Sequence, residues 1–410
     1  MAATPAAALP AKQSAGLDLL DGVVVIDLTT SIAGPYAGQL LGDLGATVIK
    51  VERPGAGDDC RAWGPPFLDD VSLWFLSVNR NKQGITLDIA RPEGRELLVR
   101  LIAQADVLLV NLVARVQRKL GIDAATLAAI NPGLIHASIT GFGLDGARAD
   151  MPCYDLIAEG YSGVMDMTGE PDGPPQKIGT PAADLLAGED AALAITAALF
   201  RKQRSGQGAA IDISMVESMT RFMAPRLLPY LGSGEPTRRS GGRDSVIAIY
   251  QAFDTADEPL TLGLGNDAIW QRFWTALGAP DAGADSAHAT NILRRSDRPA
   301  LVAKIAERLK TRGRDEWLAI FAEARVPAGP IYRLDEIAGD AGLRARGFLY
   351  GIDRDGTRLP QVGLGIAVDG CSEGCDRPPP RLGADNDTIY GGRMGLSKDE
   401  IARLAAASII

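Results

Sequence analysis

From Gly22 onward, short β-branched apolar runs alternate with longer runs of helical periodicity. Val23 to Leu28 is almost continuously apolar, which is the pattern of a strand buried on both faces. Pro35 to Leu44 follows with Pro in its first turn, as is typical of a helix. Repetition of this order predicts an α/β fold with a doubly wound, parallel sheet. Further strands are predicted at 47–52, 85–89, 107–110, 134–139 and 210–214. Helices are predicted at 93–104 and 187–201, and another helix follows the last strand and runs to about residue 231.

A change in composition divides the chain. Residues 232–243 are rich in Gly, Ser and Arg and predict a linker. Two strand-like runs and three amphipathic helical runs follow, which predicts a smaller α+β domain. The strand-like runs are 246–253 and 260–264, and the helices 267–277, 298–312 and 314–324. The sequence therefore predicts a disordered Ala/Pro-rich N-terminus (1–16), a large Rossmann-like domain (17–231), a small α+β domain (232–330) and a return segment that completes the large domain (331–410).

Charge and composition exclude several classes of protein. The net charge is −9 and there is no basic stripe, so we expect no nucleic-acid partner. No stretch has the length of an apolar membrane span and the N-terminus lacks a signal-peptide pattern, so we expect a cytoplasmic protein away from membranes. The four cysteines are scattered; Cys371 and Cys375 have no second Cys or His pair nearby, which predicts neither a disulfide framework nor a metal site.

Two kinds of catalytic site have little support. The segment from Thr29 to Pro35 follows the first strand without a GxGxxG pattern, and there is no GxxxxGK[ST] pattern, which disfavours a dinucleotide-dependent dehydrogenase. The chain has two histidines, His136 in an apolar strand and His288 in a polar loop, and neither is near a nucleophile motif. Carboxylate, Tyr or Lys chemistry therefore gains weight over Ser–His or Cys–His catalysis.

Asp184 is the carboxylate in the most informative position. It follows a loop with Gly179 and Pro181 and opens an Ala/Leu-rich run that predicts a helix. An acidic residue at a helix start is ordinarily an N-cap, because its oxygens accept from the exposed N–H groups. The same place suits a nucleophile, exposed at the end of an element and flanked by small residues. The local pattern leaves both roles open.

Several segments, taken together and in order, resemble the class III CoA-transferase family, the CaiB/BaiF-like group of formyl-CoA transferase and carnitine CoA-transferase. The resemblance covers roughly residues 20 to 410, and the ordered combination of segments is more specific than any one of them. The matching segments are 22–28, 33–35, 44–55, 79–82, 87–88, 92–94, 130–132, 141–143, 154–156, 172–175, 326–330 and 380–383.

The resemblance implies a reaction. Asp184 matches the family's catalytic aspartate, which attacks an acyl-CoA thioester and passes through a mixed anhydride and an aspartyl thioester. CoA then moves from the donor, by default succinyl-CoA, to a free carboxylic acid, and CoA is a substrate rather than a tightly bound cofactor. The family fold is an interlocked homodimer, in which each subunit passes through a ring made by the other. The identity of the donor and acceptor acids is not readable from the sequence.

The resemblance also implies contacts with CoA. Arg53 would lie against the phosphates, and Lys119 stands where the family commonly has Arg. The other implied contacts are Ile32 and Ala33, then Leu87, Asp88 and Ile89 around adenine and ribose, and Asn111 and Leu112 beside the pantetheine. The chain departs from the family pattern at 111–115, 241–245 and 384–385, and we expect these changes to tune the choice of acid.

Two alternatives accompany this interpretation. The α-methylacyl-CoA racemases share the fold but have His at the position of Tyr154. A tyrosine titrates near ~10 and is a poor base at neutral pH, so Tyr154 with Asp184 favours acyl transfer over a proton shuttle. Tyr154 would then orient the thioester or the aspartyl adduct. The other alternative is a non-catalytic CoA-binding protein in which Asp184 is only a helix cap.

Overall fold

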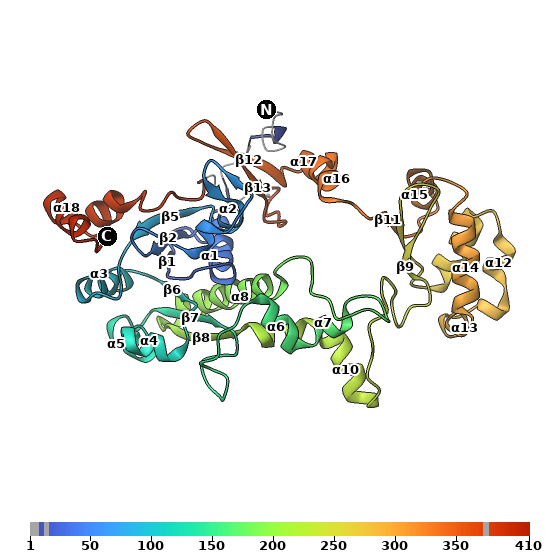
Figure 1. Cartoon of the computed structure of the whole chain (residues 1–410), viewed down its shortest axis with the longest axis horizontal. Coiled ribbons are helices and arrows are strands. Elements are labelled where there is room, and N and C mark those ends of the chain that lie inside the picture. The colour runs from blue at the N-terminus through green and yellow to red at the C-terminus, as the bar shows by residue number, and fades with distance from the viewer. Residues whose placement is uncertain (1–7, 12–15, 372–376) are drawn as a thin grey trace. The chain divides into compact units, whose positions relative to one another are not determined.

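The computed structural model describes residues 8–11, 16–371 and 377–410. The chain forms two compact units, whose elements are labelled in Figure 1. The large unit comprises the chain up to Val164, Lys177–Leu231 and Asp340–Ile410, and the small unit comprises Met165–Gln176 and Gly232–Gly339. The chain thus returns to the large unit later than the predicted residue 331, and the short segment Met165–Gln176 belongs to the small unit.

In the described part of the large unit, six strands form one parallel sheet. Its order is β5-β2-β1-β6-β7-β8, and every neighbouring pair is parallel. Counted within this sheet, the order is 3-2-1-4-5-6, which is the order of a Rossmann fold and confirms the predicted parallel sheet. The strands are β1 (Val24–Asp27), β2 (Thr47–Glu52), β5 (Lys82–Thr86), β6 (Val107–Val110), β7 (Ile135–Thr140) and β8 (Ala209–Ser214).

Helices cover both faces of the sheet (Figure 1). Alternate residues such as Ile26, Ile49 and Leu108 pack into one hydrophobic core with α3 (Pro92–Ile102) and the C-terminal helices. On the other face, α1 (Ala33–Asp43) packs against α8 (Ala182–Ser205). A Cβ at Gly188 would lie 2.7 Å from the Ala33 carbonyl oxygen, so glycine is what lets α8 approach the start of α1.

The third strand of the sheet begins earlier than the sequence pattern predicts, at Lys82 instead of residue 85. A lysine at the start of a strand ordinarily predicts a solvent-exposed position. Lys82 is nevertheless fully buried, because its ammonium pairs with the Asp27 carboxylate at 2.9 Å. Leu87 and Ile89 leave the strand yet still pack into the core. The long helix likewise begins at Ala182, five residues before the predicted start, and includes Asp184.

Within the large unit, the C-terminal segment packs beside the end of β5. The Tyr390 hydroxyl donates to the Thr86 carbonyl at 2.7 Å, and Asp88 N–H donates to Ile409 O at 2.7 Å. Pro10 O accepts from Gly351 N–H at 2.9 Å, so a described part of the predicted disordered N-terminus contacts the hairpin of β12 (Leu349–Arg354) and β13 (Thr357–Val362). Residues 1–7 and 12–15 of that prediction, and Cys375, lie outside the described residues.

The small unit has its own core. A three-stranded antiparallel sheet of order β11-β10-β9 packs with helices around Trp270, Phe273, Trp274 and Phe321. Its elements are β9 (Tyr250–Phe253), β10 (Leu260–Gly263), α11 (Asp267–Ala276), α12 (Pro280–Ala284), α13 (Asn291–Ser296), α14 (Arg298–Leu309), α15 (Arg314–Glu323), β11 (Ala328–Pro330) and α16 (Leu334–Gly339).

The remaining elements connect or extend these units. They are β3 (Phe67–Leu68), β4 (Val71–Ser72), α2 (Leu73–Ser77), α4 (Ala114–Leu120), α5 (Ala124–Ile130), α6 (Asp155–Ser162), α7 (Val164–Met167), α9 (Met215–Phe222), α10 (Ala224–Ser233), α17 (Ala341–Ala345), β12 (Leu349–Arg354), β13 (Thr357–Val362), the π-helix η4 (Asp387–Arg393) and α18 (Lys398–Ala406). Among the described residues, none of the helices combines the length and the apolar character needed to cross a membrane.

Candidate active site

A cavity of about 270 Å³ lies in the large unit beyond the carboxyl ends of the central strands. The strand order reverses between β1 and β6, and in open α/β sheets ligands bind at this switch point. Loops after β1, β6 and β7 meet there with the starts of α6 and α8. The lining residues are Thr30, Ser31, Ala33, Asn111, Val113, Ile139, Thr140, Gly141, Met151, Pro152, Cys153, Tyr154, Asp184 and Met215.

Asn111 joins the two loops at the switch point. Its side-chain Oδ1 accepts from Thr30 N–H at 3.2 Å, and its Nδ2 donates to Thr30 O at 2.8 Å. Ser31 has φ of 70°, a left-handed conformation that is uncommon outside glycine, and its N–H donates to Asp58 Oδ1 at 3.0 Å. The loop after β1, which forms one wall of the cavity, is therefore fixed by Asn111 at Thr30 and by Asp58 at Ser31.

Buried ion pairs lie below this loop. Asp27 and Lys82 pair at 2.9 Å and Lys50 and Asp58 pair at 2.9 Å, with all four side chains fully buried. Asp27 Oδ1 accepts from Thr29 N–H at 2.9 Å, and Lys50 Nζ donates to Thr29 O at 3.0 Å. The four charged groups thus pair with one another and hydrogen-bond the backbone of Thr29. These bonds fix the start of the loop that follows β1.

Asp184 lies in the first turn of α8 but does not cap it. The N-cap residue is Pro181, which has no side-chain acceptor. Oδ1 of Asp155, on α6, accepts from Ala183 N–H at 2.8 Å and from Asp184 N–H at 3.4 Å. The interpretation of Asp184 as an N-cap is therefore wrong, because another helix supplies the capping carboxylate. Within the described residues, the Asp184 side chain accepts no hydrogen bond and faces the cavity.

The surroundings of Asp184 oppose its ionisation. Burial, and then the neighbouring Asp155 carboxylate, raise the pKa of Asp184 to about 7. A carboxylate that is poorly solvated and unpaired is more basic and more nucleophilic than one in water. Strongly perturbed carboxyl groups in a cavity are typical of functional sites.

Tyr154 and Cys153 complete this side of the cavity. Tyr154 is the N-cap residue of α6 through its backbone, and its side chain is 66% exposed. Burial, and then the Asp184 charge, raise the pKa of the Cys153 thiol to about 11. The thiol therefore stays protonated at neutral pH and is a weak nucleophile, which leaves Asp184 as the candidate.

The cavity brings together four of the predicted site residues: Asp184, Tyr154, Ala33 and Asn111. The other seven do not line it. Ile32 packs instead in a small core cluster with Cys60, Phe75 and Val78. A cavity of about 270 Å³ is smaller than the ~300–1,000 Å³ of sites that enclose a whole small-molecule ligand, so it would hold only the reacting end of acyl-CoA.

The remaining predicted contacts lie outside the cavity. The Arg53 guanidinium pairs with Asp59, and its Nε donates to Gly57 O at 2.9 Å. Leu87 and Ile89 belong to the core, and Asp88 Oδ1 accepts from Ala90 N–H at 3.0 Å. Leu112 packs against the same core, and Lys119 is exposed in the last turn of α4.

Sequence reasoning did not single out several residues of the site. Ser31, Thr140 and Gly141 line the cavity because they lie at or just beyond the carboxyl ends of β1 and β7, so the rule that ligands bind there could have found them. Asp155 was part of a recognised segment, but its contact with the start of α8 joins residues 28 and 29 positions apart. No local pattern carries that information.

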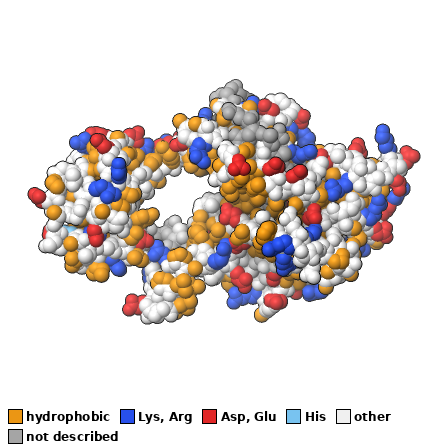
Figure 2. All heavy atoms as spheres, turned by 180° about the vertical axis from the view of Figure 1, so that it is seen from behind, with side chains coloured by type: hydrophobic (Ala, Val, Ile, Leu, Met, Phe, Trp, Pro, Cys, Tyr) orange, Lys and Arg blue, Asp and Glu red, His pale blue; other side chains and the backbone are white. Residues whose placement is uncertain are grey.

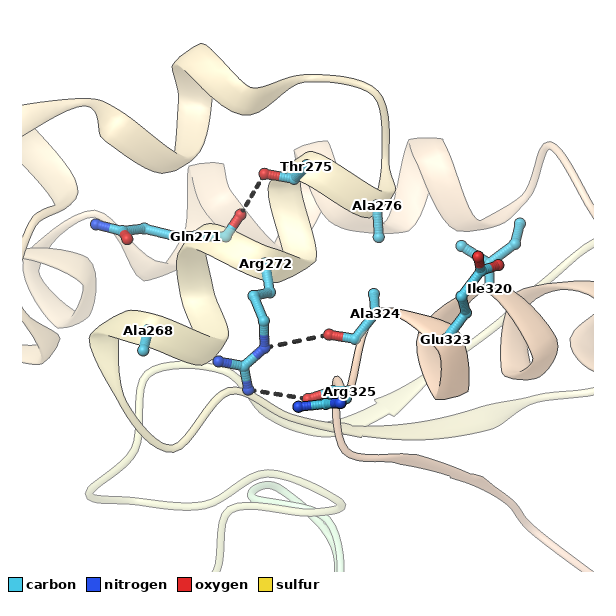
Figure 3. Close-up of a pocket in the computed structure, with 9 residues that line it drawn as sticks. All are labelled: Ala268, Gln271, Arg272, Thr275, Ala276, Ile320, Glu323, Ala324 and Arg325. Atoms are coloured by element: carbon cyan, nitrogen blue, oxygen red, sulfur yellow. Dashed lines mark hydrogen bonds between the residues drawn. The ribbon is translucent and has the colours of Figure 1, made fainter.

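The small unit has a second, larger hollow of about 880 Å³ between α11 and the end of α15 (Figure 3). Arg272 lines this hollow, and its guanidinium donates to Ala324 O at 3.1 Å and to Arg325 O at 2.9 Å. These bonds satisfy carbonyls at the C-terminus of α15, so Arg272 has a structural role. In the described chain, no group of three or more His, Cys, Asp or Glu side chains could hold a metal ion.

Comparisons with known proteins agree with this geometry. Residues 20–386 match the family model described as CoA-transferase family III. The chain is 40% identical to the succinate–glutarate CoA-transferase of Agrobacterium fabrum over 89% of this chain and 93% of that protein. It is 36% identical to the mouse succinyl-CoA:glutarate CoA-transferase over 95% of this chain and 90% of that protein.

A solved structure shares the fold. The crystal structure of a CaiB/BaiF family protein from Brucella suis has a TM-score of 0.81 and 39% identity, and the match covers 92% of this chain and 99% of that chain. The family match over most of the sequence, the identity with curated relatives and this fold all agree. The chain is an enzyme of the CoA-transferase family III, the family that its sequence segments resembled.

Proposed function

We propose that the protein transfers CoA from succinyl-CoA to a free dicarboxylic acid of the size of glutarate, through a covalent intermediate on Asp184. One observation carries the proposal: among the described residues the Asp184 carboxylate has no partner and is partly buried in the switch-point cavity, while Asp155 serves as the helix cap in its place. The names of the two relatives, which are 40% and 36% identical, support the choice of acids.

The reaction proceeds in four balanced steps. An Asp184 oxygen forms a bond to the donor acyl carbon, the C–S bond breaks, and CoA leaves as thiolate. The thiolate then attacks the Asp184 carbonyl carbon and expels the donor acid as carboxylate, which leaves an aspartyl-CoA thioester. The acceptor carboxylate attacks this thioester and releases thiolate, forming a second mixed anhydride. Thiolate finally attacks the acceptor acyl carbon and restores the Asp184 carboxylate.

The site suits a reaction with no net proton transfer. Every nucleophile in the four steps is an anion and every leaving group departs as an anion, so neither a histidine nor a metal ion is required by the proton balance. Ile32 and Tyr154, the N-cap residues of α1 and α6, do not cap through their side chains, which leaves backbone N–H groups at those helix starts for a tetrahedral oxyanion. Tyr154 lies beside Asp184 and orients the thioester or the adduct.

The contacts with the rest of CoA remain proposals. Ala33 and Asn111 would contact the thioester end, since both line the cavity. Arg53 would have to exchange Asp59 for a phosphate group in order to bind the nucleotide end. The other predicted CoA contacts and the cytoplasmic location stay predictions.

Exposed apolar side chains support a homodimer, which we propose to be interlocked as in the family. Leu193 and Phe200 on α8 are 68% and 61% exposed, and Leu231 on α10 is 67% exposed. Figure 2 shows hydrophobic side chains, coloured orange, on the surface of the large unit. Contiguous exposed apolar surface on a folded protein marks an interface. Light scattering after gel filtration should give twice the chain mass of 43.1 kDa, and a mass of one chain at micromolar concentration contradicts the proposal.

The transfer rate should depend on pH through Asp184. Because only the carboxylate attacks, kcat/KM should rise with pH and level off above the Asp184 pKa of about 7. Asp155→Asn removes a negative charge but keeps an acceptor for Ala183 N–H. Ionisation of Asp184 then becomes easier, so the rise should move to lower pH. Initial rates between pH 5 and 9 test this, and an unchanged profile in the variant contradicts the electrostatic role of Asp155.

A direct experiment tests the proposed function. Purified protein is incubated with succinyl-CoA and with acetyl-CoA against a panel of mono- and dicarboxylic acids, and acyl-CoA products are measured by mass spectrometry. We expect glutaryl-CoA from succinyl-CoA and glutarate, with a hydroxylamine-sensitive adduct on the peptide that contains Asp184. Deuterium exchange at the acyl α-carbon in the absence of an acceptor acid would instead indicate a racemase.

A further inference from the structure

Two acidic residues on α6 face the segment that carries Asp184. Asp155 and Glu159 are four residues apart on this helix and therefore lie on one face of it. Asp155 accepts from the first turn of α8 through Ala183 N–H and Asp184 N–H. Glu159 Oε2 accepts from Ile178 N–H at 2.9 Å. The pair thus holds both ends of the segment 178–184, which leads to and includes the nucleophile.

Glu159 has an unusual environment for a carboxyl group. Its side chain is fully buried, and within the described residues its Oε1 is shielded from solvent without a hydrogen-bond partner. The charged groups that act on it are Asp155 on its own helix and Lys177 in the segment before α8, and the Lys177 ammonium donates to Ile178 O at 3.0 Å. An ionised Oε1 would be a buried, unpaired charge beside another carboxylate.

A proton on Glu159 removes this conflict. A protonated carboxyl group has one O–H donor and keeps an acceptor, so Oε1–H can donate to Asp155 while Oε2 still accepts from Ile178 N–H. Burial first, with Asp155 as a further cause, raises the pKa of Glu159, in agreement with this geometry. The bond also compensates the negative charge of Asp155, which lies next to Asp184.

We propose that Glu159 is a positioning residue that remains protonated and donates a hydrogen bond to Asp155, so that the two side chains together fix the first turn of α8 and aim Asp184 at the thioester. The inference rests on the proposed function, because it assigns Glu159 a role in the attack by Asp184. Glu159 does not line the cavity and acts only through Asp155 and the segment 178–184.

Two substitutions separate a protonated from an ionised Glu159. Glu159→Gln is neutral, accepts from Ile178 N–H and donates an amide N–H to Asp155. It should keep kcat within about threefold and leave the pH profile unmoved. Glu159→Ala removes both bonds, so kcat should fall by about tenfold or more with KM for succinyl-CoA changed by less than about threefold, since positioning acts on the attack. Glu96→Gln, an exposed substitution on α3, is the matched control.

Several outcomes overturn the inference. Wild-type kcat in Glu159→Ala excludes a positioning role. A rise in kcat/KM that moves to lower pH in Glu159→Gln shows that the substitution removed a charge, so Glu159 was ionised. If Glu159→Ala does not fold, infrared difference spectra of wild type minus Glu159→Gln at pH 8 decide: we expect loss of a protonated-carboxyl band, and loss of a carboxylate band contradicts the inference.

The failure of the proposed function is distinguishable from these outcomes. If wild-type protein forms no adduct on Asp184 and transfers no CoA, the proposed function fails before any Glu159 variant is measured. If the adduct forms and both Glu159 variants behave like wild type, Asp184 is the nucleophile and only the positioning role of Glu159 is wrong.

Discussion

Asp184→Ala and Asp184→Asn should each lower kcat for CoA transfer by about three orders of magnitude or more, because both remove the atom that forms the covalent bond. Neither variant can form a mixed anhydride, so the hydroxylamine-sensitive adduct should also disappear. The fold should persist, since the Asp184 side chain accepts no hydrogen bond in the described structure and the cap of α8 comes from Asp155. Steady-state kinetics and intact-mass spectra measure both effects.

The matched control is Glu189→Gln, an exposed substitution on the same helix. It removes one negative charge from the same helix without touching the cavity and should keep near wild-type kcat. Retention of substantial turnover by Asp184→Ala with the preferred pair of acids would show that the covalent mechanism is wrong. Loss of activity in Glu189→Gln as large as in Asp184→Ala would show that charge or stability, rather than the nucleophile, explains the loss.

Asp27→Asn should destabilise the large unit by about 3–5 kcal/mol, the cost of leaving a buried charge without its partner. Lys82 is fully buried, and the Asp27 carboxylate is the anion that pairs with it at 2.9 Å. The Asn side chain keeps an acceptor for Thr29 N–H but loses the oxygen that accepts from Lys82, so the change removes the ion pair and spares the bond to Thr29. Urea unfolding followed by circular dichroism should show a lower midpoint with little change in slope.

The double variant Asp27→Asn/Lys82→Met is the control for this pair. Removing both charges should cost clearly less than the sum of the two single changes, because no unpaired charge remains. Lys50 and Asp58 also contact the Thr29–Ser31 loop, so the residual cost measures how far the two pairs are coupled. Additive single and double effects would mean that the Asp27–Lys82 contact contributes no pairing energy.

Hydrophobic periodicity predicted most of the large unit. β2 and β6 have the predicted limits, because β6 is wholly apolar and β2 has β-branched residues at Thr47, Val48, Ile49 and Val51. The same criterion placed the start of β5 too late at Lys82. A charged residue carries no sign in the sequence that a partner 55 positions away will bury it.

The sequence by itself determined the parallel α/β sheet, the smaller α+β segment and the family, and it singled out Asp184 as the candidate carboxylate, because periodicity, composition and segment order can be read along the chain. Only the tertiary structure decided that Asp184 does not cap α8. The capping acceptor is Asp155, which the packing of α6 brings to the N–H groups of Ala183 and Asp184. Hydrogen bonds between elements that are distant in sequence arise from packing, so no local pattern contains them.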